Sequence, residues 1–224
     1  MGSDDLFNKR KRRSRSLKRR KPTREPYAKV LIVCEGEKTE PNYFNGLRDH
    51  YKLNSTNVEI TGESASSPAG ILKYAQQRYR KEKDAGDPFD KVFCVFDKDS
   101  HQTYEQVLQA IGNVTPKAVF HAITSVPCFE FWLLLHFKYT TKPYYGERTN
   151  SPCQQVLDDL KKYLPKYTKG AGNIFGELQK RLKFAKDNAT RSLESACSTK
   201  TDNPSTKVHE LVDFLQNIKA DTKR

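Results

Sequence analysis

The sequence predicts an α/β protein with a mainly parallel central sheet. Two apolar runs, at 30–34 and 92–96, have the near-continuous hydrophobic character of strands buried on both faces of a sheet. Segments with helical periodicity alternate with these runs, and strand–helix–strand units of this length form parallel sheets through right-handed crossovers. Acidic residues directly follow both runs, so these residues should lie at the carboxyl edge of the sheet, where α/β proteins build their sites.

The elements of the sheet follow one another along the amino-terminal half. After a linker at 22–26, a first strand covers 28–34, and the next helix runs from Pro41 to about residue 51, since proline suits a first helical turn. A short strand is then expected at 57–61, a helix from Pro68, a strand ending at 96, a helix at about 103–111 and a fourth strand at 118–124.

The carboxyl-terminal part reads as helical. Residues 129–137 are apolar nearly all round, which indicates a buried helix. Asn203 followed by Pro204 has the pattern of a helix cap and first turn. Three further helices are therefore expected at roughly 152–163, 173–189 and 205–217.

Three regions follow from this pattern. We expect a disordered basic arm at 1–26, an α/β core at 27–137, and a helical extension packed on that core at 138–224.

Positive charge is concentrated in the arm. The chain has a net charge of +13, and residues 9–21 contain ten Lys or Arg and no acid. Such a block either binds nucleic-acid phosphates without sequence preference or acts as a solvated tail. The nucleic-acid interpretation assigns phosphate contacts to Lys9, Arg10, Lys11, Arg12, Arg13, Arg15, Lys18, Arg19, Arg20 and Lys21, with Lys38 in the main part of the chain.

Cysteine spacing and hydropathy indicate a cytoplasmic protein. The five cysteines contain no Cys-x-x-Cys pair and three lie in or beside apolar runs, which favours reduced core thiols over zinc ligands or disulfides. No signal-like or membrane-spanning apolar stretch is present, so no membrane association is expected. No P-loop pattern is present either, so any ATPase step must come from a partner.

Asp97 and Asp99 are candidate metal ligands. In an extended segment, residues two apart point the same way, so both carboxylates face one site and Lys98 faces away. Such carboxylates suit Mg²⁺, although a strand-end turn would also use Asp here. Glu35, followed by a glycine that permits close backbone approach, can ligate metal or exchange protons, or can be an exposed turn residue.

Glu130, His136 and Lys38 have weaker signals. Glu130 opens the apolar helix. It is either a first-turn acid favoured by the helix dipole, or an acid that contacts the metal ligands or binds a second metal ion. His136 reads as a hydrogen-bonded core residue. Lys38 either neutralises a phosphate or faces solvent.

Four segments together resemble the RloB-like family. They are 33–44 (VCEGEKTEPNYF), 96–99 (FDKD), 128–137 (CFEFWLLLHF) and 203–206 (NPST), and the resemblance spans about 27–217. The family resemblance implies a Toprim-like three-layer α/β/α fold in which 27–137 is the catalytic core and Glu35, Asp97 and Asp99 are the catalytic acids. Glu130 is similar to an additional acid of nucleases of the overcoming-lysogenisation type. Lys169, in a Tyr-x-Lys segment, would stabilise developing negative charge.

The family resemblance also implies a function. Such proteins are similar to effectors of bacterial phage defence, often encoded beside an ATPase. We therefore expect a Mg²⁺- or Mn²⁺-dependent nuclease acting on RNA, such as tRNA, or on DNA. The alternatives are a Toprim-type nucleotidyl transferase and a non-catalytic nucleic-acid-binding or adaptor module.

Overall fold

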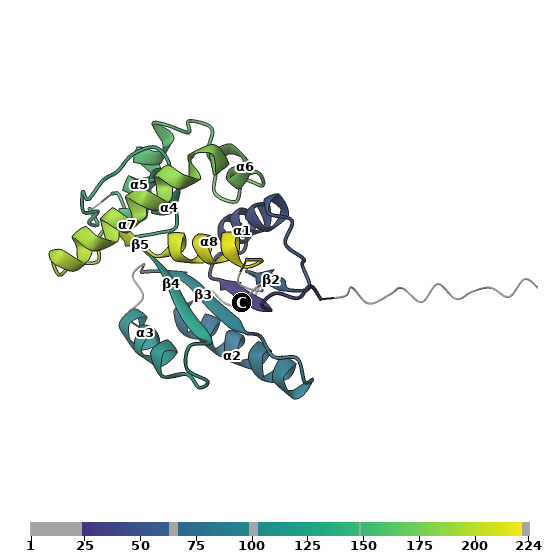
Figure 1. Ribbon diagram of the computed structural model, residues 1–224. Coiled ribbons are helices and arrows are strands. Elements are labelled where there is room, and N and C mark those ends of the chain that lie inside the picture. Colours follow the sequence, from purple (N-terminus) through teal and green to yellow (C-terminus); the bar gives the residue numbers. More distant parts are fainter. Residues whose placement is uncertain (1–23, 63–66, 99–102, 148, 221–224) are drawn as a thin grey trace, which may run out of the picture.

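A five-stranded sheet organises the chain (Figure 1). The computed structural model describes residues 24–62, 67–98, 103–147 and 149–220. The strand order is β2-β1-β3-β4-β5, in which the first four strands are parallel and β5 runs antiparallel to β4. In chain order the strands are β1 (Val30–Cys34), β2 (Val58–Thr61), β3 (Lys91–Asp97), β4 (Phe120–Val126) and β5 (Ser205–Thr206).

Helices cover both faces of the sheet. On one face lie α2 (Pro68–Asp84) and α3 (Tyr104–Asn113), and their apolar side chains form one core with β1, β3 and β4. The other face carries the larger core and the remaining helices. These are α1 (Thr39–His50), α4 (Glu130–Leu134), α5 (Pro152–Lys161), α6 (Ile174–Leu178), α7 (Leu182–Ser198) and α8 (Val208–Asn217). The predicted α/β/α architecture is confirmed.

The apolar runs form strands because both of their faces are covered. Every residue of β1 is fully buried, with Leu31 and Val33 in the core under α2 and α3 and Ile32 in the core on the opposite face. The predicted start of α2 at Pro68 is also confirmed. Ser67 caps this helix by accepting a hydrogen bond from the backbone N–H of Gly70 at 3.3 Å.

Residues 203–206 do not begin a helix, and this prediction is wrong. Ser205 and Thr206 form β5, and α8 begins only at Val208. Thr206 pairs with Ser125 at the end of β4, where their hydroxyl oxygens lie 3.1 Å apart. Asn203 does not cap a helix, because its side chain bonds the backbone of residue 144. Pairing of residues 205–206 with β4 has therefore overridden the local tendency of the Asn203–Pro204 segment to start a helix.

Two other helices differ in extent from the prediction. The helix expected at 129–137 is regular only over α4, and every residue of α4 is buried as expected. The helix expected at 173–189 is α6, a 3-10 turn (Gln179–Arg181) and α7, which continues to Ser198. The break lets α6 insert Phe175 beside Tyr43 of α1, with ring centroids 5.4 Å apart.

Two further expectations concern cysteines and membranes. Cys34, Cys94 and Cys128 are buried free thiols, as predicted. No helix within the described residues is both long and apolar enough to cross a bilayer.

Candidate active site

Glu35 and Asp97 meet at the carboxyl edge of the sheet. Glu35 directly follows β1 and Asp97 is the last residue of β3, and these two strands are parallel neighbours in the sheet. The backbone N–H of Glu35 donates to the carbonyl of Val95 at 3.0 Å, which extends the ladder by one residue. The backbone N–H of Asp97 then donates to Oε2 of Glu35, also at 3.0 Å. The structure therefore brings these two predicted residues together.

The carboxylate of Asp97 is tied to the turn after β4. Its Oδ2 accepts a hydrogen bond from the backbone N–H of Phe129 at 3.1 Å. Withdrawal from water raises the pKa of Asp97 well above its ordinary value, and repulsion by Glu40 and Glu130 raises it further, against the opposing effect of the Phe129 N–H. Asp99 lies outside the described residues.

Glu130 is buried in the first turn of α4 and has a cationic neighbour. Its side chain is 3% exposed, and Nζ of Lys169 lies 3.4 Å from its Oε1. The hydroxyl of Tyr167 donates to the same oxygen at 3.4 Å. Burial by itself lowers the pKa of Lys169, but attraction by Glu130 outweighs it and raises that pKa above its ordinary value. The predicted residues Glu130 and Lys169 are thus in contact.

A loop from the carboxyl-terminal part brings Tyr167 and Lys169 to the sheet edge. This loop is fixed to the start of α1 by two hydrogen bonds: Gly170 N–H donates to Oγ1 of Thr39 at 3.0 Å, and Nδ2 of Asn42 donates to the Gly170 carbonyl at 2.9 Å. Gly170 has a φ of +81°, which favours glycine, so the chain can turn back directly after Lys169.

Glu40 belongs to the same cluster and was missed in the sequence. It lies in the first turn of α1 and is only 6% exposed. Burial raises the pKa of its carboxyl group to about 7, with further increases from the charges of Glu130 and Glu35. A Cβ atom on Gly36 would overlap the Glu40 carboxylate, so a side chain at residue 36 would displace this buried group.

A signal for Glu40 was present in the sequence. It is the third acid of the segment that begins at Glu35, and it directly precedes Pro41 at a helix start. Taking Pro41 as the first helical residue placed Glu40 in a loop, whereas α1 begins at Thr39 and turns the carboxylate inward.

The remaining predicted residues lie around this cluster. Lys98 faces away from it, as predicted, and pairs with Asp202 at 2.5 Å and Glu105 at 3.2 Å. Lys38 is exposed, and its aliphatic chain lies against Gly170. His136 is a fully buried core residue that bonds the Trp132 carbonyl at 3.0 Å. The arm residues at 9–21 lie outside the described residues.

The donor chemistry of the cluster suits a hard divalent cation. Glu35, Glu40, Asp97 and Glu130 present carboxylate oxygens, and their mutual repulsion is the kind that a bound cation relieves. However, no three acidic, His or Cys side chains among the described residues are arranged as a ready set of metal ligands. The metal therefore stays a prediction.

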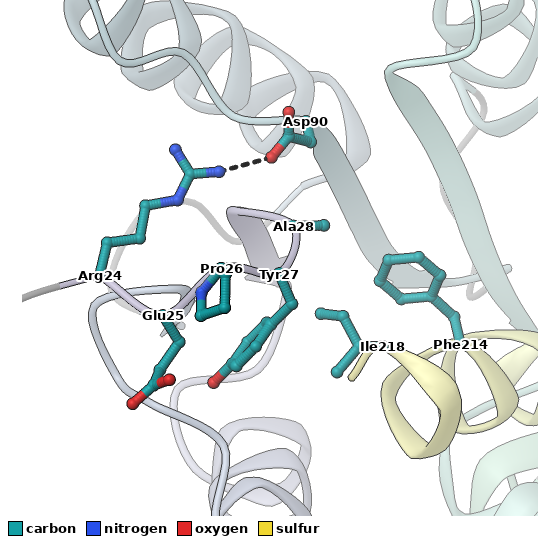
Figure 2. A pocket seen from close by; sticks show the side chains of 8 residues that line it. All are labelled: Arg24, Glu25, Pro26, Tyr27, Ala28, Asp90, Phe214 and Ile218. Carbon is teal, nitrogen blue, oxygen red and sulfur yellow. Dashed lines mark hydrogen bonds and ion pairs between the residues drawn. The ribbon is translucent and has the colours of Figure 1, made fainter. Parts of the chain in front are cut away.

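A separate hollow lies at the opposite, amino-terminal edge of the sheet (Figure 2). It has a volume of about 440 Å³ and lies between the segment before β1 and the end of α8, where Tyr27, Phe214 and Ile218 line it. Arg24 closes one side through an ion pair with Asp90 at 2.8 Å. The basic arm therefore joins the described part of the chain at the edge away from the acidic cluster.

Comparison with known proteins gives one match. No curated protein and no solved structure matches the chain. The family model described as RloB-like protein matches residues 30–215, which is most of the chain and includes every acidic residue of the cluster. The chain therefore belongs to the RloB-like family.

Proposed function

We propose that this protein is a divalent-metal-dependent phosphodiesterase that cleaves a nucleic acid. The observation that carries the proposal is the gathering of Glu35, Glu40, Asp97 and Glu130 at the carboxyl edge of the sheet, with Lys169 beside them. Phosphodiester cleavage needs hard oxygen ligands for a cation and positive charge for the phosphate, and this edge supplies both kinds of group.

Two of the carboxylates are already fixed in position. Glu35 is held by the backbone N–H of Asp97, and Asp97 by the backbone N–H of Phe129. Together with Asp99 they would hold Mg²⁺ or Mn²⁺. Such an ion, when bound, polarises a phosphoryl oxygen and lowers the pKa of its water. Holding both acids by backbone groups means that little reorganisation is needed when a substrate arrives.

Lys169 is the group best placed to meet a substrate phosphate. Its side chain is 56% exposed, while its Nζ contacts the buried Glu130. An ammonium group in this position can turn from the carboxylate toward a phosphate that enters from solvent. Glu40, with a pKa of about 7, can exist in either protonation state near neutral pH and is a candidate for proton exchange beside Glu35.

The direct test is a cleavage assay with end-labelled tRNA, unstructured RNA, and single- and double-stranded DNA. We expect cleavage of at least one substrate with Mg²⁺ or Mn²⁺ and none with EDTA. Glu35→Gln and Asp97→Asn should each reduce the rate by about 100-fold or more, because each removes a ligand without changing shape. Glu194→Gln, an exposed acid on α7, is the matched control and should keep full activity.

This assay, an incorporation assay with labelled nucleoside triphosphates and a binding assay together separate the alternatives. Cleavage that survives both Glu35→Gln and Asp97→Asn contradicts the proposed site. Incorporation of labelled nucleoside triphosphates without cleavage indicates a nucleotidyl transferase. Salt-sensitive nucleic-acid binding with no turnover, unchanged by Asp97→Asn, indicates a binding or adaptor module.

A role in phage defence together with a separately encoded ATPase is also a proposal, supported by the family resemblance. Its test is the plating efficiency of phages on cells that carry this gene with the neighbouring ATPase gene, if one is present. Protection should be lost in Glu35→Gln cells and kept in Glu194→Gln cells. Equal protection by both variants would contradict an effector role for the acidic edge.

A further inference from the structure

One edge of the sheet is open along β4. On its inner side β4 pairs with β3 from Phe120 to Ser125, but on its outer side β5 pairs only with Ser125 and Val126. Among the described residues, no strand lies beside the outer side of 120–123. An open edge of this kind presents unpaired backbone groups that can template a further strand.

The backbone direction along β4 identifies the unpaired groups. The carbonyls of Val119 and Ser125 accept hydrogen bonds from residues at the two ends of β3, whereas the carbonyl of Thr124 accepts from Lys207 on the outer side. Because backbone groups alternate sides along a strand, those of Phe120 and Ala122 point outward with Thr124.

A groove runs along this open edge. Figure 1 shows β4 between α3 on one side and α8 on the other. The groove between them has a volume of about 550 Å³. It is lined by β4 and by Leu108, Ile111 and Gly112 of α3 and Lys207, Glu210 and Phe214 of the α8 side. An added strand would therefore have a helix against each of its faces.

The two walls of the groove differ in character. The α3 wall is apolar, and the side chains of Phe120 and Ala122 belong to the core on that face. The α8 wall carries Lys207 and Lys91. Lys91 lies two residues before Phe93 in β3, so its side chain is on the same face of the sheet as Phe93, which belongs to the core under α8. Nζ of Lys91 donates to the Ala118 carbonyl at 2.7 Å and lies 3.2 Å from Nε2 of His121, and neither Lys91 nor Lys207 forms an ion pair with a described carboxylate. The groove lining also contains one exposed acid, Glu210.

We propose that this groove binds an extended peptide segment of a partner protein. The peptide would add as a strand beside β4, with apolar side chains toward α3 and acidic side chains toward Lys91 and Lys207. Main-chain hydrogen bonds to Phe120 and Ala122 would supply affinity, and the alternating side chains would supply specificity.

Charge favours a partner over other copies of this chain. If the β4 edge of a second copy paired with this one, the α8 walls of both copies would lie on the same face of the joined sheet. The lysines of the two copies would then lie close together and repel each other. The strongly basic stretch at 9–21 of this chain has the same sign of charge as the α8 wall. An acidic, partly apolar strand complements both walls.

The test uses the full chain and two fluorescein-labelled synthetic peptides with blocked ends. One alternates valine with glutamate, and the other alternates valine with lysine. By fluorescence anisotropy, the glutamate peptide should bind the wild type about tenfold more tightly than the lysine peptide. Amide hydrogen exchange should show protection of Phe120 and Ala122 on binding, which contact between charges alone would not cause.

Two variants and one control test the mechanism. Ala122→Pro removes only an outward N–H, since the bonds to β3 come from the odd-numbered residues of β4, and should abolish binding while the melting temperature is retained. Lys207→Glu should weaken binding of the glutamate peptide about tenfold, and the exposed α7 change Lys183→Glu should leave it unchanged.

Three outcomes would overturn the proposal. The first is that the wild type binds both peptides equally tightly or binds neither. The second is that a folded Ala122→Pro protein binds the glutamate peptide as tightly as the wild type does. If Ala122→Pro unfolds, unchanged binding by Lys207→Glu serves as this second outcome. The third is a dimer in solution that Ala122→Pro converts to a monomer, which would assign the edge to a second copy.

Discussion

Protonation of His136 should destabilise the fold as the pH falls from about 6.5 toward 4. The side chain is fully buried beside Trp132, whose ring centroid lies 4.8 Å away. Nδ1 donates to the Trp132 carbonyl, and Nε2 has no hydrogen-bond partner among the described residues. A second proton on this ring would therefore be a buried, unpaired charge, and burial lowers the pKa of His136 to about 4.

The size of the effect follows from the two pKa values. The unfolded chain binds the proton with a pKa of about 6.5, and the folded chain with one of about 4. Between these values the unfolded state binds more protons, so the free energy of unfolding falls as the pH falls. At pH 5 the loss attributable to His136 is about 2 kcal/mol relative to pH 7.5.

The assay is urea unfolding of the wild type and His136→Gln at pH 7.5 and 5.0. Glutamine keeps a donor for the Trp132 carbonyl but does not titrate. The wild type should lose about 2 kcal/mol relative to the variant between these pH values. Comparing the two proteins is essential because Glu40, whose pKa is raised to about 7, stabilises the fold as the pH falls and masks the histidine in the wild type alone. A difference that does not change with pH would refute a buried neutral His136.

Three further predictions concern the acidic edge and the core. Without added metal at pH 8, Glu40→Gln should raise the free energy of unfolding by on the order of 1–3 kcal/mol, because an ionised buried carboxylate is removed. This gain should become smaller below about pH 7, where the Glu40 carboxyl group is protonated in the folded state. An equal gain at pH 5.5 would contradict the prediction. Gly36→Ala should cost about 1–3 kcal/mol in urea unfolding because its Cβ overlaps the Glu40 carboxylate, and the cost should shrink in a Gly36→Ala, Glu40→Ala double variant. Trp132→Ala should cost about 3–5 kcal/mol, since the ring is fully buried, and a loss below about 1 kcal/mol would mean that the ring is not packed as described.

The sequence by itself determined the sheet and one edge of it. A strand that is apolar along its whole length is stable only where both faces of its sheet are covered. The sequence therefore identified β1 and β3 as buried strands. Parallel strands place their carboxyl ends together, so Glu35 and Asp97 could be assigned to one site from the sequence, and the structure brings them into contact. Residue spacing and position also identified Asp99 and Glu130 as candidates, and the family resemblance then added Lys169.

Only the tertiary structure decided which distant groups join that edge. Lys169 reaches Glu130 because a loop far along the chain is bonded to Thr39 and Asn42 at the start of α1. Likewise, residues 205–206 became a strand because the end of β4 offered them a partner. Local propensity is worth tenths of a kcal/mol to about 1 kcal/mol per residue, so contacts between residues far apart in the chain override it wherever burial and backbone pairing demand.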